Sequence, residues 1–134
     1  MHKNVLLLCN DNSALSIMAE AVLEKNLPGI EVFSAALKKV KPLKSDVKQA
    51  LQKDGSWSEK YHAKEFESVA NKNFDLVIVL SDIATKLIPE FDENTTVIQI
   101  EYEEPDYRNS TNSARFLKTL KMELIPLTRD VLEL

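Results

Sequence analysis

The single cysteine of the chain lies where a strand is expected to end. Residues 5–8 form a continuous apolar run, Cys9 follows, and a polar segment then leads into a helical pattern. A thiol between a strand end and a helix N-terminus is in the arrangement that lowers a thiol pKa and makes a nucleophile. An equally open alternative is a structural role, because free cysteine is among the most buried residue types.

The segment after Cys9 has the form of an anion-binding cradle. It consists of Asn10, Asp11, Asn12, Ser13, Ala14, Leu15 and Ser16. Main-chain N–H groups in such a loop, together with the first turn of the following helix, attract a phosphate or a similar oxyanion. This loop carries an acid, Asp11, and neither Arg nor Lys, so the cradle lacks a cation.

Apolar strands alternate with helical patterns along the chain. Strands are predicted at 4–9, 30–35, 74–80 and 95–100. Helices are predicted at 13–26, at 44–54, at about 62–72, over a short stretch from 81, and from about 112 to the C-terminus. Pro126 is expected to kink or restart the last helix. Asn12 or Ser13 is the expected N-cap of the first helix. The alternation predicts βαβ units, a parallel sheet and helices on both of its faces. The loops at 9–16, 81–83 and 101–109 should therefore meet in one crevice.

Length and composition restrict the class of protein. A chain of 134 residues is expected to form one domain, residues 1–134. The net charge of −4 argues against a nucleic acid or an anionic membrane surface as partner. The N-terminal apolar run of about five residues is too short for the core of a signal peptide or for a membrane span. One cysteine fits a reducing, cytoplasmic compartment. His2 and His62 lack the spacing of a metal site, and no cofactor is expected.

The segment "CNDNSALSIMAEA" (9–21) resembles the active-site loop of low-molecular-weight protein tyrosine phosphatases and the related thioredoxin-coupled arsenate reductases. The matching residues are Cys9, Asn12, Ser13, Ser16, Met18, Ala19 and Glu20. Three further segments resemble the same family: "VFSAAL" (32–37), "FDLVIVLSD" (74–82) and "EYEEPDY" (101–107). The resemblance covers nearly the whole chain. It implies a three-layer αβα domain with a four-stranded parallel sheet in the order 2-1-3-4.

The resemblance also implies roles for the residues that match. Cys9 corresponds to the family's nucleophile. Asn12 and Ser16 correspond to residues that shape the loop and support the thiolate. Glu104, before Pro105, takes the place of the aspartate that protonates the leaving group. Its alternative reading is an ordinary solvated acid in an acidic loop.

Three positions depart from the family pattern, each with a physical cost. Leu15 occupies the position of the arginine that binds the oxyanion, and each charge-assisted bond lost there contributes about 1.5–3 kcal/mol. Two such bonds correspond to on the order of several hundred-fold or more in rate. Asp11 replaces a glycine, repels an anion and disfavours a thiolate at Cys9. Ser81 stands where the reductases carry a second redox cysteine, which argues against arsenate reduction.

These departures leave more than one hypothesis of function. The first is a degenerate phosphatase-like protein, a pseudoenzyme that binds an anion, a phosphorylated ligand or a protein partner. The alternative is an active cysteine-dependent phosphatase, a phosphoric monoester hydrolase with a cation recruited from elsewhere. The candidate cations are Lys38, Lys39, Lys41 and Arg108. A thiol-based sensor is a third class without specific support, and Tyr102 and Tyr107 are candidates for a binding surface.

Overall fold

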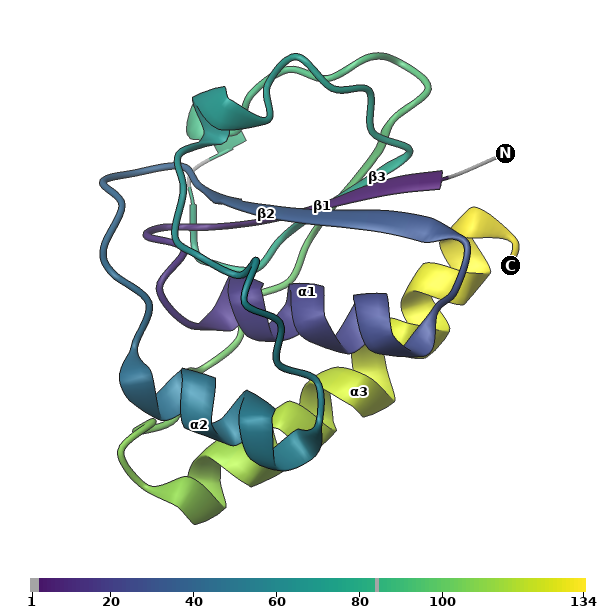
Figure 1. The fold of residues 1–134 in the computed structure, drawn as a ribbon. Helices are drawn as coiled ribbons and strands as arrows, with labels where there is room; N and C mark the ends of the chain where they lie inside the picture. Colours follow the sequence, from purple (N-terminus) through teal and green to yellow (C-terminus); the bar gives the residue numbers. More distant parts are fainter. Residues whose placement is uncertain (1–2, 84) are drawn as a thin grey trace.

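A computed structural model gives the fold of residues 3–83 and 85–134, which leaves His2 outside the described residues (Figure 1). The elements are β1 (Lys3–Cys9), α1 (Leu15–Asn26), β2 (Ile30–Ala36), α2 (Ser45–Asp54), β3 (Leu76–Val79), β4 (Thr96–Gln99) and α3 (Ser110–Leu132), with 3-10 turns η1 (Phe66–Ser68) and η2 (Thr85–Leu87). The strands are parallel and follow the order β2-β1-β3-β4. The predicted fold class is confirmed.

Strand β1 lies inside the sheet and is covered on both faces. Val5 and Leu7 belong to the core cluster that includes the α-helices, whereas Leu6 and Leu8 belong to the cluster on the opposite face. A strand that is buried on both faces has a continuous run of apolar residues in its sequence rather than an alternating pattern. This placement puts Cys9 at the carboxyl edge of an inner strand, beside the end of β2.

The two outer layers differ in kind. All three α-helices pack on one face of the sheet, and the other face is covered by irregular chain with the turns η1 and η2 (Figure 1). The helix predicted at about 62–72 is therefore wrong apart from the single turn at 66–68. The expectation of α-helices on both faces is wrong as well, and the short helix predicted from 81 is the turn η2 at Thr85–Leu87. The main chain at Lys64 and Glu65 instead pairs with Ala36 at the end of β2, which holds this segment extended. Phe66 and Val69 then reach the core from one short turn.

The helix ends also depart in detail from the sequence prediction. Helix α1 begins at Leu15 with Ala14 as its N-cap, and neither Asn12 nor Ser13 caps it. Helix α3 begins at Ser110 and continues through Pro126 without a restart. Proline removes only one main-chain hydrogen bond there, on an exposed side of the helix where water can replace it. Within the described residues, no helix is long and apolar enough to cross a membrane.

Candidate functional site

Cys9 is held in a buried, polar setting. Its side chain is 4% exposed, and the main-chain N–H of Asn12 lies 3.2 Å from the sulfur. The Ser16 hydroxyl oxygen is 2.8 Å from the same sulfur. Burial raises the pKa of Cys9, the contacts with Ser16 and Asn12 lower it, and the charge of Asp11 raises it, with a raised pKa as the net result. The direction agrees with the sequence-based expectation, but burial rather than Asp11 is the main cause.

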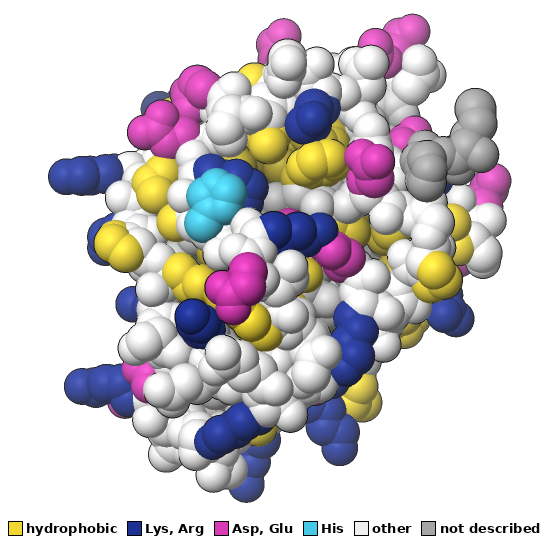
Figure 2. Space-filling view, viewed as in Figure 1, with side chains coloured by type: hydrophobic (Ala, Val, Ile, Leu, Met, Phe, Trp, Pro, Cys, Tyr) yellow, Lys and Arg dark blue, Asp and Glu magenta, His cyan; other side chains and the backbone are white. Residues whose placement is uncertain are grey.

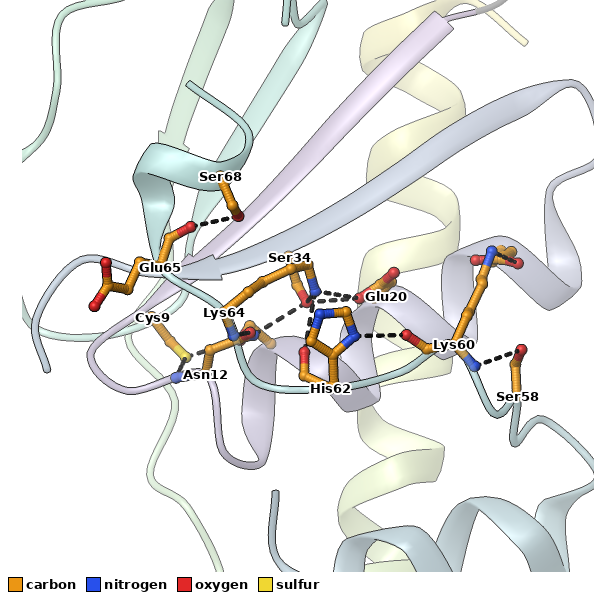
Figure 3. Close-up of polar contacts among 12 residues, drawn as sticks. Cys9, Asn12, Glu20, Ser34, Ser58, Lys60, His62, Lys64, Glu65 and Ser68 are labelled. Carbon is orange, nitrogen blue, oxygen red and sulfur yellow. Dashed lines mark hydrogen bonds and ion pairs between the residues drawn. The ribbon is translucent and has the colours of Figure 1, made fainter. Parts of the chain in front are cut away.

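Asn12 organises the loop around Cys9 (Figure 3). Its backbone is left-handed, with φ at 54°, a conformation that Asn tolerates better than most residues. Its side-chain amide donates to the hydroxyls of Ser16 at 2.7 Å and Ser34 at 3.0 Å, and its carbonyl accepts the main-chain N–H of Lys64 at 2.9 Å. The fully buried side chain thereby joins the cysteine loop to β2 and to the segment before η1.

A buried ionic group lies beyond Asn12. The Ser34 hydroxyl donates to a carboxylate oxygen of Glu20 at 2.6 Å, and the Lys64 ammonium lies 3.9 Å from that oxygen. The Glu20 carboxyl is almost fully buried, which raises its pKa, while Lys64 and Ser34 act in the opposite direction. Sequence analysis gave these residues no role. An acid on the most buried face of α1 was the available signal for Glu20, whereas the approach of Lys64 depends on the extended segment that was predicted as a helix.

Leu15, at the position of the family's arginine, is packed in the core and supplies no positive charge to the loop. It is 2% exposed and belongs to the main hydrophobic cluster, so the first residue of α1 contributes packing and no positive charge. Of the candidate cations, the Lys41 ammonium lies 4.0 Å from an Asp11 carboxylate oxygen, and Arg108 pairs with Asp106 through two hydrogen bonds of 3.0 Å. Lys38 and Lys39 are exposed. Figure 2 shows Lys and Arg side chains projecting outward over the lower part of the molecule, where α2 lies.

An open cavity of about 570 Å³, called the mouth below, borders the cradle at Asp11 and Ser13. It is lined by Asp11, Ser13, Lys44, Ser45, Asp46, Glu104, Pro105, Asp106, Tyr107 and Arg108. The structure thus brings Asp11 and Ser13 of the cysteine loop and the candidate acid Glu104 to the same cavity, whose lining does not include Cys9. Glu104 accepts a hydrogen bond of 2.7 Å from the hydroxyl of Tyr107, whose pKa is raised by burial and by this carboxylate. The lining contains four acidic and two basic side chains, which disfavours an anionic ligand.

The remaining residues of the cradle shape the loop. Both the main-chain N–H and the hydroxyl of Ser13 donate to an Asp11 carboxylate oxygen, at 3.1 and 2.8 Å, so Asp11 takes a loop amide as an internal anion would. Ala14 is buried beside them. The Asn10 N–H lies 3.3 Å from the Ser81 hydroxyl, which brings the loop at 81–83 to the same edge of the sheet. In residues 3–83 and 85–134, no three metal-binding side chains gather as a metal site.

Comparisons with known proteins agree with this geometry. Residues 4–125 match the sequence profile of the family described as low molecular weight phosphotyrosine protein phosphatase. The chain belongs to this family. No match was found among curated protein sequences.

Solved structures of similar fold include proteins named as arsenate reductases and as tyrosine phosphatases. An arsenate reductase from Archaeoglobus fulgidus is 22% identical, with a TM-score of 0.75, 92% of this chain covered and 97% of the other. A thioredoxin-dependent arsenate reductase from Corynebacterium glutamicum is 18% identical at a TM-score of 0.77, covering 96% and 61%. The tyrosine phosphatase AmsI from Erwinia amylovora is 16% identical at 0.70, covering 90% and 87%. At these identities the likeness establishes the fold of the phosphatase family and no particular activity.

Proposed function

We propose that this chain is a degenerate member of the low molecular weight phosphatase family, with weak or no hydrolysis of phosphate monoesters and a binding or regulatory role at the cysteine loop. The observation that carries the proposal is the burial of Leu15 at the first position of α1. An oxyanion above Cys9 would meet no guanidinium from this helix. Its negative charge would meet the carboxylate of Asp11 instead.

The acidic mouth gives further support. The cavity over the loop is lined by more carboxylates than cations, and Arg108 and Lys41 are each beside a carboxylate of their own. A phosphate monoester would have to displace these contacts before either cation could bind it. A protein partner that contacts the mouth through neutral or basic groups fits the charge better than a phosphorylated ligand.

The active phosphatase remains the rival proposal, because Glu104 shares a cavity with the cysteine loop. The leaving-group oxygen of a phosphate ester requires a proton donor within hydrogen-bond reach, on the side of the phosphorus away from the nucleophile. The carboxylate of Glu104, however, already accepts the hydroxyl of Tyr107. The rival also needs a cation at the oxyanion, and the charged candidates at the mouth are exposed.

Hydrolysis of p-nitrophenyl phosphate tests the proposal. We expect a very low rate from the wild-type chain and a gain on the order of a hundred-fold or more from the double variant Leu15→Arg with Asp11→Gly, which restores the cation and removes the repulsion. The added Cys9→Ser change should abolish that gain. Urea unfolding of each variant checks that the buried position accepts arginine.

The opposite outcome is equally clear. A wild-type rate close to that of an active phosphatase of the family measured alongside, abolished by Cys9→Ser, would refute the degenerate proposal. Substitution of Lys38, Lys39, Lys41 and Arg108 by Gln, one at a time, would then identify the recruited cation. Titration with inorganic phosphate followed by calorimetry separates binding from catalysis, and we expect no saturable binding to the wild-type chain.

A further inference from the structure

A second cavity lies between α2 and the first half of α3. Its volume is about 730 Å³, and it is lined by one face of each helix and by the residues just before α3. The two helices lie side by side in the lower part of Figure 1. We propose that this cavity, called the helical groove below, binds an acidic amphipathic segment of a partner protein. Cys9 does not line the groove, so the site does not depend on catalysis at the cysteine loop.

The groove is long because its lining follows both helices. On α2 the lining runs from Asp46 to Asp54, and on α3 it runs from Ser110 to Lys121. Residues three or four positions apart recur in both sets, and such residues lie on one face of a helix. At 1.5 Å per residue the two stripes extend for about 12 and 17 Å. This length accommodates a bound segment of two to three helical turns.

Positive charge is concentrated along this groove in a chain whose net charge is −4. Five basic and two acidic side chains line it, and Lys and Arg side chains gather over this part of the molecule (Figure 2). Of the two acids, Asp54 forms an ion pair with Lys121 and lies 4.0 Å from the Lys25 ammonium, so its charge is already neutralised. The other, Asp46, is at the end that the groove shares with the mouth. The groove therefore attracts anionic groups.

Three of the five cations form no ion pair in the part of the chain that the structure describes. They are Lys53 on α2 and Arg115 and Lys118 on α3, and all three are exposed. A paired cation such as Arg108, which contacts Asp106, must give up its partner before it binds another carboxylate. Because the three exposed cations need not do so, they are the groups to which a ligand's carboxylates are most readily attracted.

The floor of the groove is apolar. Ala50 of α2 and Ala114 of α3 both line it, and neither side chain extends beyond its Cβ, which leaves the space open. The lining also includes Leu117, which is 4% exposed and belongs to the main hydrophobic cluster. An apolar floor beside exposed cations is complementary to a segment with aliphatic side chains on one face and carboxylates next to them.

The same features disfavour a nucleic acid as the ligand. Single strands bind through bases that stack on aromatic side chains. Among the described residues that line the groove, Tyr107 is the only aromatic one, and it is 7% exposed with its hydroxyl bonded to Glu104. A phosphate backbone that continued past Asp46 would meet the four carboxylates of the mouth. A peptide can change there from acidic to neutral or basic residues, so the charge pattern favours a protein.

Fluorescence anisotropy with a labelled peptide tests the proposal. The probe has about twelve residues, with Leu at every third or fourth position and Glu beside each Leu, and spans about 18 Å as a helix. We expect saturable binding that weakens by about tenfold or more when Gln replaces every Glu of the peptide. A rise from about 0.05 M to about 0.5 M NaCl should also weaken binding, because salt screens exposed charges.

Substitutions in the protein locate the site. Lys53→Gln, Arg115→Gln and Lys118→Gln should each weaken binding by about two- to five-fold, and the triple variant by on the order of tenfold or more. Ala114→Gln leaves the net charge unchanged and fills part of the floor, so it should weaken binding as well. Arg129→Gln is the matched control, because Arg129 is an exposed residue of α3 that does not line the groove. It should leave the affinity unchanged.

Three results would overturn the proposal. The first is equal affinity for the Glu and Gln peptides, or no saturable binding of either. The second is an equal loss of affinity in Arg129→Gln and Lys118→Gln, which would mean attraction to the whole surface rather than to the groove. The third is tighter binding of an oligothymidylate with the same number of negative charges. The assay contains no phosphate monoester and needs no reaction at Cys9, so its failure is distinguishable from failure of the proposed function.

Discussion

Replacement of Asn12 should destabilise the whole domain as well as the cysteine loop. The fully buried side chain forms three hydrogen bonds, to Ser16, Ser34 and the main chain of Lys64, at 2.7, 3.0 and 2.9 Å. A typical net contribution is about 0.5–1.5 kcal/mol for each bond. We therefore expect Asn12→Gly to lower the free energy of unfolding by roughly 1.5–4.5 kcal/mol.

The comparison with Asn12→Ala separates the side chain from the backbone. Glycine accepts the positive φ of this position freely, whereas alanine in the left-handed region costs about 1–2 kcal/mol. The greater flexibility of an unfolded chain with glycine offsets part of this difference, by roughly 0.5–1 kcal/mol. Asn12→Ala should thus be as unstable as Asn12→Gly or somewhat less stable.

Urea unfolding followed by circular dichroism measures both variants. A domain of this length has a total stability of about 7–20 kcal/mol, so both should remain folded without denaturant. Asn12→Gly with wild-type stability would show that the three buried hydrogen bonds give no net stabilisation. Asn12→Gly clearly less stable than Asn12→Ala would refute the role assigned to the left-handed backbone.

Three other measurements test separate features. Leu15→Ala should reduce the free energy of unfolding by about 2–5 kcal/mol in a urea titration, because the side chain is buried in the core; a loss near zero would contradict its packing role. The midpoint of Cys9 alkylation against pH should lie above the usual range for a thiol. Asp11→Asn should lower that midpoint only slightly, because burial is the larger cause of the raised pKa, and a thiolate formed well below neutral pH would contradict this. Burial alone would raise the pKa of Asp54, but hydrogen bonds, chiefly from Lys121, make the net pKa lower than the unfolded value of 3.8. The ionised Asp54 therefore adds to the free energy of unfolding above pH 3.8, and this contribution is lost as the pH falls through the folded pKa. Asp54→Asn should therefore cost up to about 1 kcal/mol near neutral pH and almost nothing in strong acid, and a cost that persists in acid would contradict this ion pair.

The position of Cys9 at the end of a buried strand could be predicted from the residues themselves, whereas the order of the strands followed from the family resemblance. Continuous apolar runs such as 5–8 occur where a strand is buried on both faces. Such a run can be recognised in the sequence because the hydrophobicity of each side chain is a local property. The sequence also shows directly that position 15 is not Arg and that the chain has one cysteine. The irregular layer over the second face could not be predicted. Phe66 and Val69 are spaced as on a helix, but the segment that leads to them is held extended by its pairing with Ala36.

Only the tertiary structure decided how the site is organised. Asn12 or Ser13 was predicted as the cap of the first helix, and the family resemblance gave Asn12 a loop-shaping role without naming its partners. The structure supplies them, because the Asn12 side chain joins Ser16, Ser34 and the main chain of Lys64. These partners lie up to 52 residues away, and no local pattern encodes a hydrogen bond over that separation. The sequence by itself determined which chemical groups are present and which strand ends they follow. Their directions and charges depend on chain packing, because a buried polar group must find its partner wherever the fold brings one.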